Sequence, residues 1–337
     1  MPFLRALIRT TRMLRHTSAL GLGLPPDEEL LLDAPDDRLA PALVAAGRGD
    51  HGPAAKALAL TRDAAEWENR DRAVQRLAAF AAARPEWFEA WQEASPHDPD
   101  LLLVKAELAV TRALAAPAHA ELLREVTPLI LAAAESDPRD PVPWRIALDH
   151  ARGTNAPHTE FEQLWARAVR RSPHHYGCHV AALRYLSAAW YGSHKECFDF
   201  AERAAQDALP GSLLQALPAR AALAYLTSGA PHTGIPHARL DAAADLAAKL
   251  SRSYEPADPW PAEVRNLLTC VLVELGRWED ALDQLRLIGP YATSFPWDRL
   301  TDDPLGHFME LRGQVRLEVA AAMPLRGGPV RSDDHYA

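Results

Sequence analysis

Apolar residues recur every three or four positions along most of the chain, and the alternating runs that would indicate strands are almost absent. This spacing places the apolar side chains on one face of a helix. Proline, with 28 residues, gathers between the periodic segments, where it ends one helix and starts the next. The pattern therefore predicts an all-α fold of many helices of about 10–16 residues, joined by short turns.

Four prolines that follow predicted helices are separated by 39, 35 and 37 residues. Intervals of this size are typical of helical-hairpin repeats, which stack to bury a continuous core. We therefore predict a repeat array over residues 31–323, with an amphipathic helix and acidic linker at 1–30 before it. A disordered polar tail is expected at 324–337. Residues 1–30 are expected to cap one end of the array, and a helix at 308–323 the other. The four prolines are Pro99, Pro138, Pro173 and Pro210.

Two segments carry a more detailed signature. GRWEDALDQLRLIG (276–289) has a Gly-x-Trp turn before small and large apolar residues at helical spacing, and FEQLWARAVRRSP (161–173) is a helix closed by proline. These segments resemble the tetratricopeptide repeat, and the resemblance extends over most of residues 36–290. WYGSHKECFDFA (190–201) is similar to a Trp-x-Gly-Ser turn and helix of bacterial helical-repeat proteins. The resemblance implies a right-handed α-solenoid of tetratricopeptide-like hairpins.

A solenoid of that family would hold an extended or helical peptide in a groove lined by the first helix of each hairpin. By this resemblance, the residues expected to contact a partner are Trp144, His175, His179 and Arg184. Arg184 would contact a carboxylate; alternatively, it faces solvent. A proline-rich stretch at 289–306 offers three further aromatic contacts, which could instead fold back over the last helices as part of the core. These aromatics are Tyr291, Phe295 and Trp297.

The stretch SPHHYGCHVAALRYLSAAWYGSHKECFDF (172–200) concentrates histidine and cysteine. The pattern predicts one hairpin, with a first helix at about 175–189 and a second helix that begins near Ser193. The Ser193 hydroxyl would cap the second helix. His175 and His179 are four residues apart on the first helix, so a ligand from a neighbouring helix could complete a metal site with them. Cys178 or Cys197 could act as a nucleophile, but no base is evidently placed beside either. Packing accounts for Cys197, which occupies a small-residue position of the repeat.

The first residues form an amphipathic pattern without an acidic residue before Asp27. Over residues 3–16, an apolar stripe lies opposite Arg5, Arg9 and Arg12. This helix could dock on the protein itself, lie on an anionic membrane surface, or act as an organellar transit peptide. The acidic run that follows, PDEELLLDAPDD, could pair with those arginines.

Composition excludes several classes of function. The net charge of −9 argues against a general nucleic-acid binder, and three unpaired cysteines favour a reducing cytoplasm over a disulfide framework. Nucleotide-binding loops, nucleophile elbows and zinc-protease motifs are absent from the sequence, so no cofactor is expected. Charged runs such as residues 66–72 are expected to be solvated.

The sequence therefore favours a non-catalytic cytoplasmic scaffold or regulator that binds a protein segment. Two alternatives remain open: an enzyme or small-molecule binder with its site on the concave face, and a membrane-peripheral protein that docks through residues 3–16.

Overall fold

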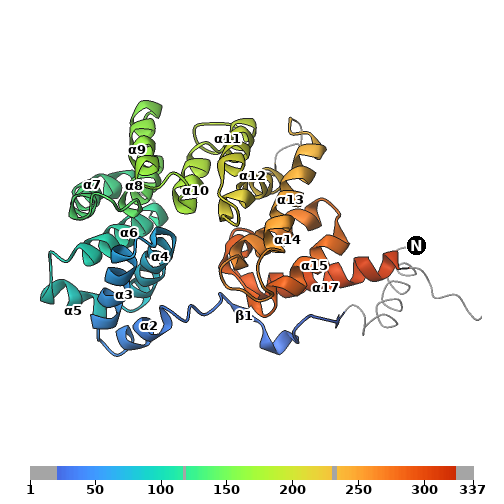
Figure 1. The fold of residues 1–337 in the computed structure, drawn as a ribbon, viewed down its shortest axis with the longest axis horizontal. Coiled ribbons are helices and arrows are strands. Elements are labelled where there is room, and N and C mark those ends of the chain that lie inside the picture. Colours follow the sequence, from blue (N-terminus) through green and yellow to red (C-terminus); the bar gives the residue numbers. More distant parts are fainter. Residues whose placement is uncertain (1–20, 117–118, 230–233, 324–337) are drawn as a thin grey trace, which may run out of the picture. The chain divides into compact units, whose positions relative to one another are not determined.

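The computed structural model describes residues 21–116, 119–229 and 234–323, which form the predicted all-α fold (Figure 1). Contacts divide the chain into two compact units: one runs from Pro35 to Leu250, and the other combines the segment up to Ala34 with the segment from Ser251. The division near residue 250 was not predicted from the sequence. Among the described residues, no helix is long and apolar enough to cross a membrane. The predicted helix at 3–16 and the predicted tail lie outside the described residues.

The Pro35–Leu250 unit contains twelve of the helices labelled in Figure 1, and a short 3-10 helix, η2. In chain order they are α2 (Ala40–Ala46), α3 (Gly52–Asp63), α4 (Trp67–Ala83), α5 (Glu86–Ala94), α6 (Pro99–Ala115), α7 (His119–Ser136), α8 (Val142–Gly153), α9 (His158–Arg171), α10 (Tyr176–Tyr185), α11 (His194–Asp207), η2 (Leu213–Ala216), α12 (Leu217–Leu226) and α13 (His237–Ser251).

Helices of this unit pack chiefly against their neighbours along the chain, as α2 does on α3, α6 on α7, α8 on α9 and α11 on α12. Helix α4 also packs on α6, and α8 on α10, so alternate helices touch. One continuous apolar core extends from Leu39 to Tyr185. Stacked helical hairpins require packing of this kind, because one hairpin cannot cover its own apolar face. The right-handed solenoid itself remains a prediction.

The helix boundaries follow the local signals of the sequence. Proline occupies the first turn of α2, α3, α6, α8 and α12, where its missing N–H costs no helical hydrogen bond. Ser193 caps α11, as predicted, by accepting a hydrogen bond from the Glu196 N–H at 3.2 Å. Gly276 has a φ of 71° in the turn that follows α14. Its N–H donates to the Val273 carbonyl, and the next N–H donates to Leu272, which closes the helix end.

The second unit is built from both ends of the chain. Its elements are η1 (Asp27–Glu29), β1 (Leu31–Leu32), α14 (Ala262–Glu274), α15 (Trp278–Ile288), β2 (Tyr291–Ala292), α16 (Ser294–Trp297) and α17 (Pro304–Ala322). Strand β1 pairs in parallel with β2, and the Asp33 carboxylate accepts hydrogen bonds from the Ser294 N–H and hydroxyl. Arg312 of α17 forms an ion pair with Asp27. The expectation that residues 1–30 and 308–323 cap opposite ends is therefore wrong, because residues from both regions bind each other within one unit.

The aromatic residues predicted at 289–306 divide between core and surface. Trp297 is fully buried and donates from Nε1 to the Asn266 Oδ1 at 2.9 Å, so it is part of the core rather than a free contact. Tyr291 and Phe295 are half-buried. The alternative that this segment folds back on the last helices therefore describes Trp297 correctly.

Candidate functional site: a groove between helices α9 and α11

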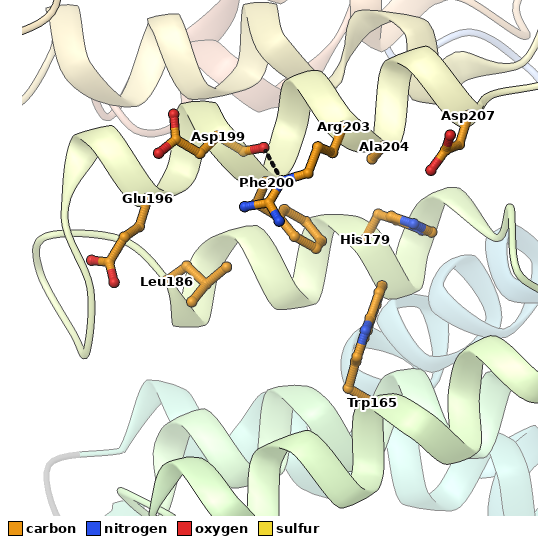
Figure 2. Close-up of a pocket in the computed structure, with 9 residues that line it drawn as sticks. All are labelled: Trp165, His179, Leu186, Glu196, Asp199, Phe200, Arg203, Ala204 and Asp207. Atoms are coloured by element: carbon orange, nitrogen blue, oxygen red, sulfur yellow. Dashed lines mark hydrogen bonds between the residues drawn. The ribbon is translucent and has the colours of Figure 1, made fainter.

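An open groove of about 380 Å³ lies between α9 and α11, with α10 along its floor (Figure 2). Helix α9 contributes one large side chain, α10 contributes one residue within the helix and one directly after it, and α11 contributes the rest. The lining residues are Trp165, His179, Leu186, Glu196, Asp199, Phe200, Arg203, Ala204 and Asp207.

Three aromatic rings form the interior of the groove. The ring centroids of Trp165 and Phe200 are 5.6 Å apart, and that of His179 lies 4.9 Å from Trp165 and 5.8 Å from Phe200. Trp165 and Phe200 are half-buried, whereas His179 is only 6% exposed. The groove therefore offers apolar ring surface to solvent from two different helices, a favourable surface for an apolar side chain.

The imidazole of His179 is held in one neutral form. Its Nδ1 lies 2.9 Å from the carbonyl oxygen of His175, an acceptor, so Nδ1 carries the proton and Nε2 does not. Burial, reinforced by the neighbouring imidazoles of His175 and His174, lowers the pKa of His179 to about 4, although the hydrogen bond to the His175 carbonyl opposes this shift. At neutral pH the groove floor is therefore uncharged.

This pKa predicts a pH dependence of stability. An unfolded histidine titrates near 6.5, so the His179 contribution is complete above that pH and is lost as the pH falls towards 4. The loss amounts to about 3 kcal/mol at most. Urea unfolding followed by circular dichroism should show this decline, and His179→Asn should flatten it. The exposed His97→Asn serves as a control and should follow the wild type. An unchanged slope in His179→Asn would contradict the assignment.

The rim of the groove is formed by charged side chains of α11. Glu196 and Asp207 are exposed near the two ends of the helix, and Arg203 lies between them with its Nε donating to the Asp199 carbonyl at 2.9 Å. The Asp199 carboxylate is engaged elsewhere, because Arg239 lies 2.5 Å from it. Two carboxylates and one guanidinium group therefore lie at the rim.

Small residues allow the start of α11 to lie close to the end of α10. A Cβ at Gly192 would lie 2.2 Å from the Leu186 carbonyl oxygen, so the turn admits glycine alone. Cys197 is buried, and its thiol donates to the Leu186 carbonyl at 3.2 Å. Burial raises the pKa of Cys197 to about 12. The cysteine thus acts as a packing residue, which agrees with the packing interpretation and not with a nucleophile.

Thiol reactivity tests this packing role. All three cysteines are buried, and burial also raises the pKa of Cys270 to about 12. We expect the native protein to react with a chromogenic disulfide at about pH 8 at least a hundredfold more slowly than the unfolded chain. Three thiols should react in guanidinium chloride. Rapid reaction of one thiol in the native protein, lost in Cys197→Ala, would show that the α10–α11 contact is open.

The other predicted partner residues are not among the residues that line the groove. His175 is fully buried and directly precedes α10. Its Nδ1 accepts a hydrogen bond from the Cys178 N–H at 3.2 Å. It is therefore a helix cap and not a ligand facing outward beside His179. Trp144 is 6% exposed, and Arg184 is exposed with its guanidinium 3.7 Å from Asp149. Among the described residues, no three His, Cys, Asp or Glu side chains are grouped to hold a metal.

A buried ionic network in the same unit contradicts the expectation of a solvated face at residues 66–72. Arg70 is 1% exposed; its Nε donates to Asp140 at 2.6 Å, and its other nitrogens reach the Leu58 carbonyl at 2.8 Å and Asp100 at 2.7 Å. Arg62 donates to the second oxygen of Asp100 at 2.6 Å. These contacts connect α3, α4 and α6 to the residues just before α8.

Arg145 of α8 is the centre of a second group. Its Nε and one terminal nitrogen donate to Asp71 at 2.9 and 2.7 Å, and the other terminal nitrogen donates to Glu107 at 2.6 Å. Burial raises the pKa of the Asp71 carboxyl, but Arg145 and His175, together with the hydrogen bonds that the carboxylate accepts, outweigh burial and lower that pKa. For Glu107 the balance is reversed, and burial raises the pKa. Asp71 accepts two hydrogen bonds from Arg145 and is therefore bound more tightly by Arg145 than Glu107 is.

The start of α10 is anchored to the same group. Glu68 accepts a hydrogen bond from the Tyr176 N–H at 2.6 Å, and a Cβ at Gly177 would lie 2.2 Å from the Asp71 carboxylate. Glycine is therefore needed where α10 meets α4. Carboxylate and helix N-terminus attract each other, which fixes the position of α10 and of His179 on it.

No protein-family model matches this chain, and no curated protein matches it.

Proposed function

We propose that the protein is a non-catalytic binding protein whose α9–α11 groove receives a segment of a partner protein. The half-exposed ring pair of Trp165 and Phe200 in an open groove carries this proposal, since exposed aromatic surface in a concave site commonly anchors a partner. Successive helices of this unit pack against one another beyond a single hairpin, and such an extended surface supports a protein partner over a small molecule.

The groove also indicates the chemistry of the segment. An apolar side chain would pack between Trp165 and Phe200, where His179 adds an uncharged ring. A basic side chain beside it would meet Glu196 or Asp207 at the rim, and an acidic one would meet Arg203. A segment that alternates an apolar anchor with charged residues fits this arrangement.

Site-specific photocrosslinking tests the proposal. A photoreactive amino acid at Asp207, which lines the groove, should crosslink to a defined peptide of the partner in cell lysate. The same group at the adjacent exposed Gln206, which does not line the groove, is the matched control. When Phe200→Ala is added to the variant that carries the photoreactive amino acid at Asp207, the crosslink should be abolished. Circular dichroism should show that the fold is unchanged. Equal crosslinking from both positions, or a crosslink that survives Phe200→Ala, would overturn the proposal.

A further inference from the structure

The C-terminal end of α9 carries three arginines, two of which cover Trp144. Arg167 and Arg171 are four residues apart and therefore lie on the same side of the helix. Their guanidinium carbons lie 5.0 and 4.7 Å from the centroid of the Trp144 ring. Arg170 is exposed on the same turn. The opposite side of α9 carries Trp165, so this cluster is separate from the groove.

The guanidinium group of Arg171 is held in place before any ligand arrives. Its Nε donates to the Pro138 carbonyl at 2.8 Å, and one terminal nitrogen donates to the Arg167 carbonyl at 2.8 Å. The remaining nitrogen is left for another acceptor. Ordering an arginine in advance removes much of the entropic cost of binding through it.

Among the described residues, none of the three arginines has a carboxylate within ion-pair distance. The nearby Asp137 is taken by Arg139 at 3.1 Å. The Nε1–H of Trp144, the ring beneath the cluster, is buried without an acceptor. The cluster of Trp144, Arg167, Arg170 and Arg171 therefore presents hydrogen-bond donors and no acceptor of its own.

The charges of the cluster are not balanced locally. Burial lowers the pKa of Arg171, and the positive charges of Arg170 and Arg167 lower it further; Asp140, which is paired with Arg70, only partly opposes them. The C-terminal end of α9 supplies about half a negative charge, which stabilises basic residues there. The three arginines together carry three positive charges, so more than two remain after the charge of the helix end is subtracted. An anion would relieve their mutual repulsion.

We propose that Trp144, Arg167, Arg170 and Arg171 form a binding site for a dianionic oxyanion of the phosphate-monoester class. A planar guanidinium fork fits phosphate oxygens in pairs, and a dianion neutralises two arginines where a carboxylate neutralises one. The site does not depend on the proposed groove. Its phosphate could come from a phosphorylated protein segment or from a free phosphate compound.

Calorimetric titration at constant ionic strength tests the site with three probes: inorganic phosphate, a short peptide containing phosphoserine, and acetate. Both phosphate probes should give saturable binding to the full chain, and acetate should give none. Tighter binding of the phosphopeptide than of inorganic phosphate identifies a phosphorylated segment as the source; the reverse order identifies a free phosphate compound. Arg170→Gln, which alters an exposed side chain, should weaken binding roughly tenfold.

The matched control is Arg124→Gln on α7, because Arg124 is also exposed and also lacks a carboxylate partner among the described residues. It should bind the phosphate probes as the wild type does. Arg167→Gln should behave like Arg170→Gln, and circular dichroism should show both variants folded. Equal binding by wild type and Arg170→Gln, or acetate binding as tightly as phosphate, would overturn the proposal and leave the arginines as stabilisers of the helix end.

Discussion

Replacing Arg145 with methionine is expected to lower the free energy of unfolding of the Pro35–Leu250 unit by about 3–5 kcal/mol. The guanidinium is 5% exposed and serves Asp71 and Glu107 with three hydrogen bonds. Methionine fills much of the same space but leaves both carboxylates buried and without their cation. Such a loss is a large fraction of the 5–15 kcal/mol that stabilises an ordinary protein.

Thermal and urea unfolding measure this loss, with the exposed Arg124→Met as the control, which should stay within about 0.5 kcal/mol of wild type. Combining Arg145→Met with Asp71→Asn should recover part of the loss, since one stranded charge is removed. The two substitutions are therefore expected to be strongly non-additive. A single variant as stable as wild type, or losses that simply add, would show that the network is not held together by its charges.

The sequence predicted the helices because their boundaries depend on local signals. The prolines at helix starts, Ser193 before α11 and Gly276 after α14 act within one turn of the chain, and each was identified from its neighbours. Contacts across the fold could not be found in that way. Arg145 lies 74 residues from Asp71, and Tyr176 lies 108 residues from Glu68.

One signal of the buried network was nevertheless present. On α4, Arg70 shares a helix face with Ala73, Val74 and Leu77, which are all buried. A charge at the apolar positions of a helix indicates a buried partner, because an isolated charge would be too costly there. We interpreted residues 66–72 as a charged surface because opposite charges alternate along them. The apolar neighbours were the better guide.

The groove, too, could be predicted from the sequence only in part. His179 is the predicted partner residue that lines it, and the repeat resemblance pointed to it through its position in the hairpin. Trp165 and Phe200 lie at apolar positions of α9 and α11, and spacing does not reveal that both keep one side exposed. Exposure depends on how the helices pack around the groove, and the approach of α11 to α10 depends on the contacts of Gly192 and Cys197 with the Leu186 carbonyl.

Replacing Arg265 with methionine is expected to be as damaging in the second unit, for a different reason. Arg265 is fully buried, yet its partners are neutral: the Ser251 hydroxyl and four carbonyls. Burial lowers its pKa, although Asp258 and Tyr254 counteract this. The five hydrogen bonds hold the segment after α13 against the end of α15. They run at 2.9–3.1 Å to Ser251 Oγ and to the carbonyls of Ser251, Tyr254, Glu255 and Leu287.

Methionine would remove all five hydrogen bonds, although the carbonyls of Ser251, Glu255 and Leu287 would each keep one backbone N–H donor. The cost is about 1–3 kcal/mol for each acceptor that neither another donor nor water reaches. Arg265→Lys should recover little, because three N–H donors on a flexible stem cannot serve five acceptors spread around a plane. We expect amide hydrogen exchange to accelerate specifically in residues 252–258, which contain the Tyr254 and Glu255 carbonyls. Arg299→Met, at an exposed arginine of the same unit, is the control and should leave that exchange unchanged. Wild-type protection of residues 252–258 in Arg265→Met would mean that the segment is held by its own turns, and that the arginine merely fills space beneath it.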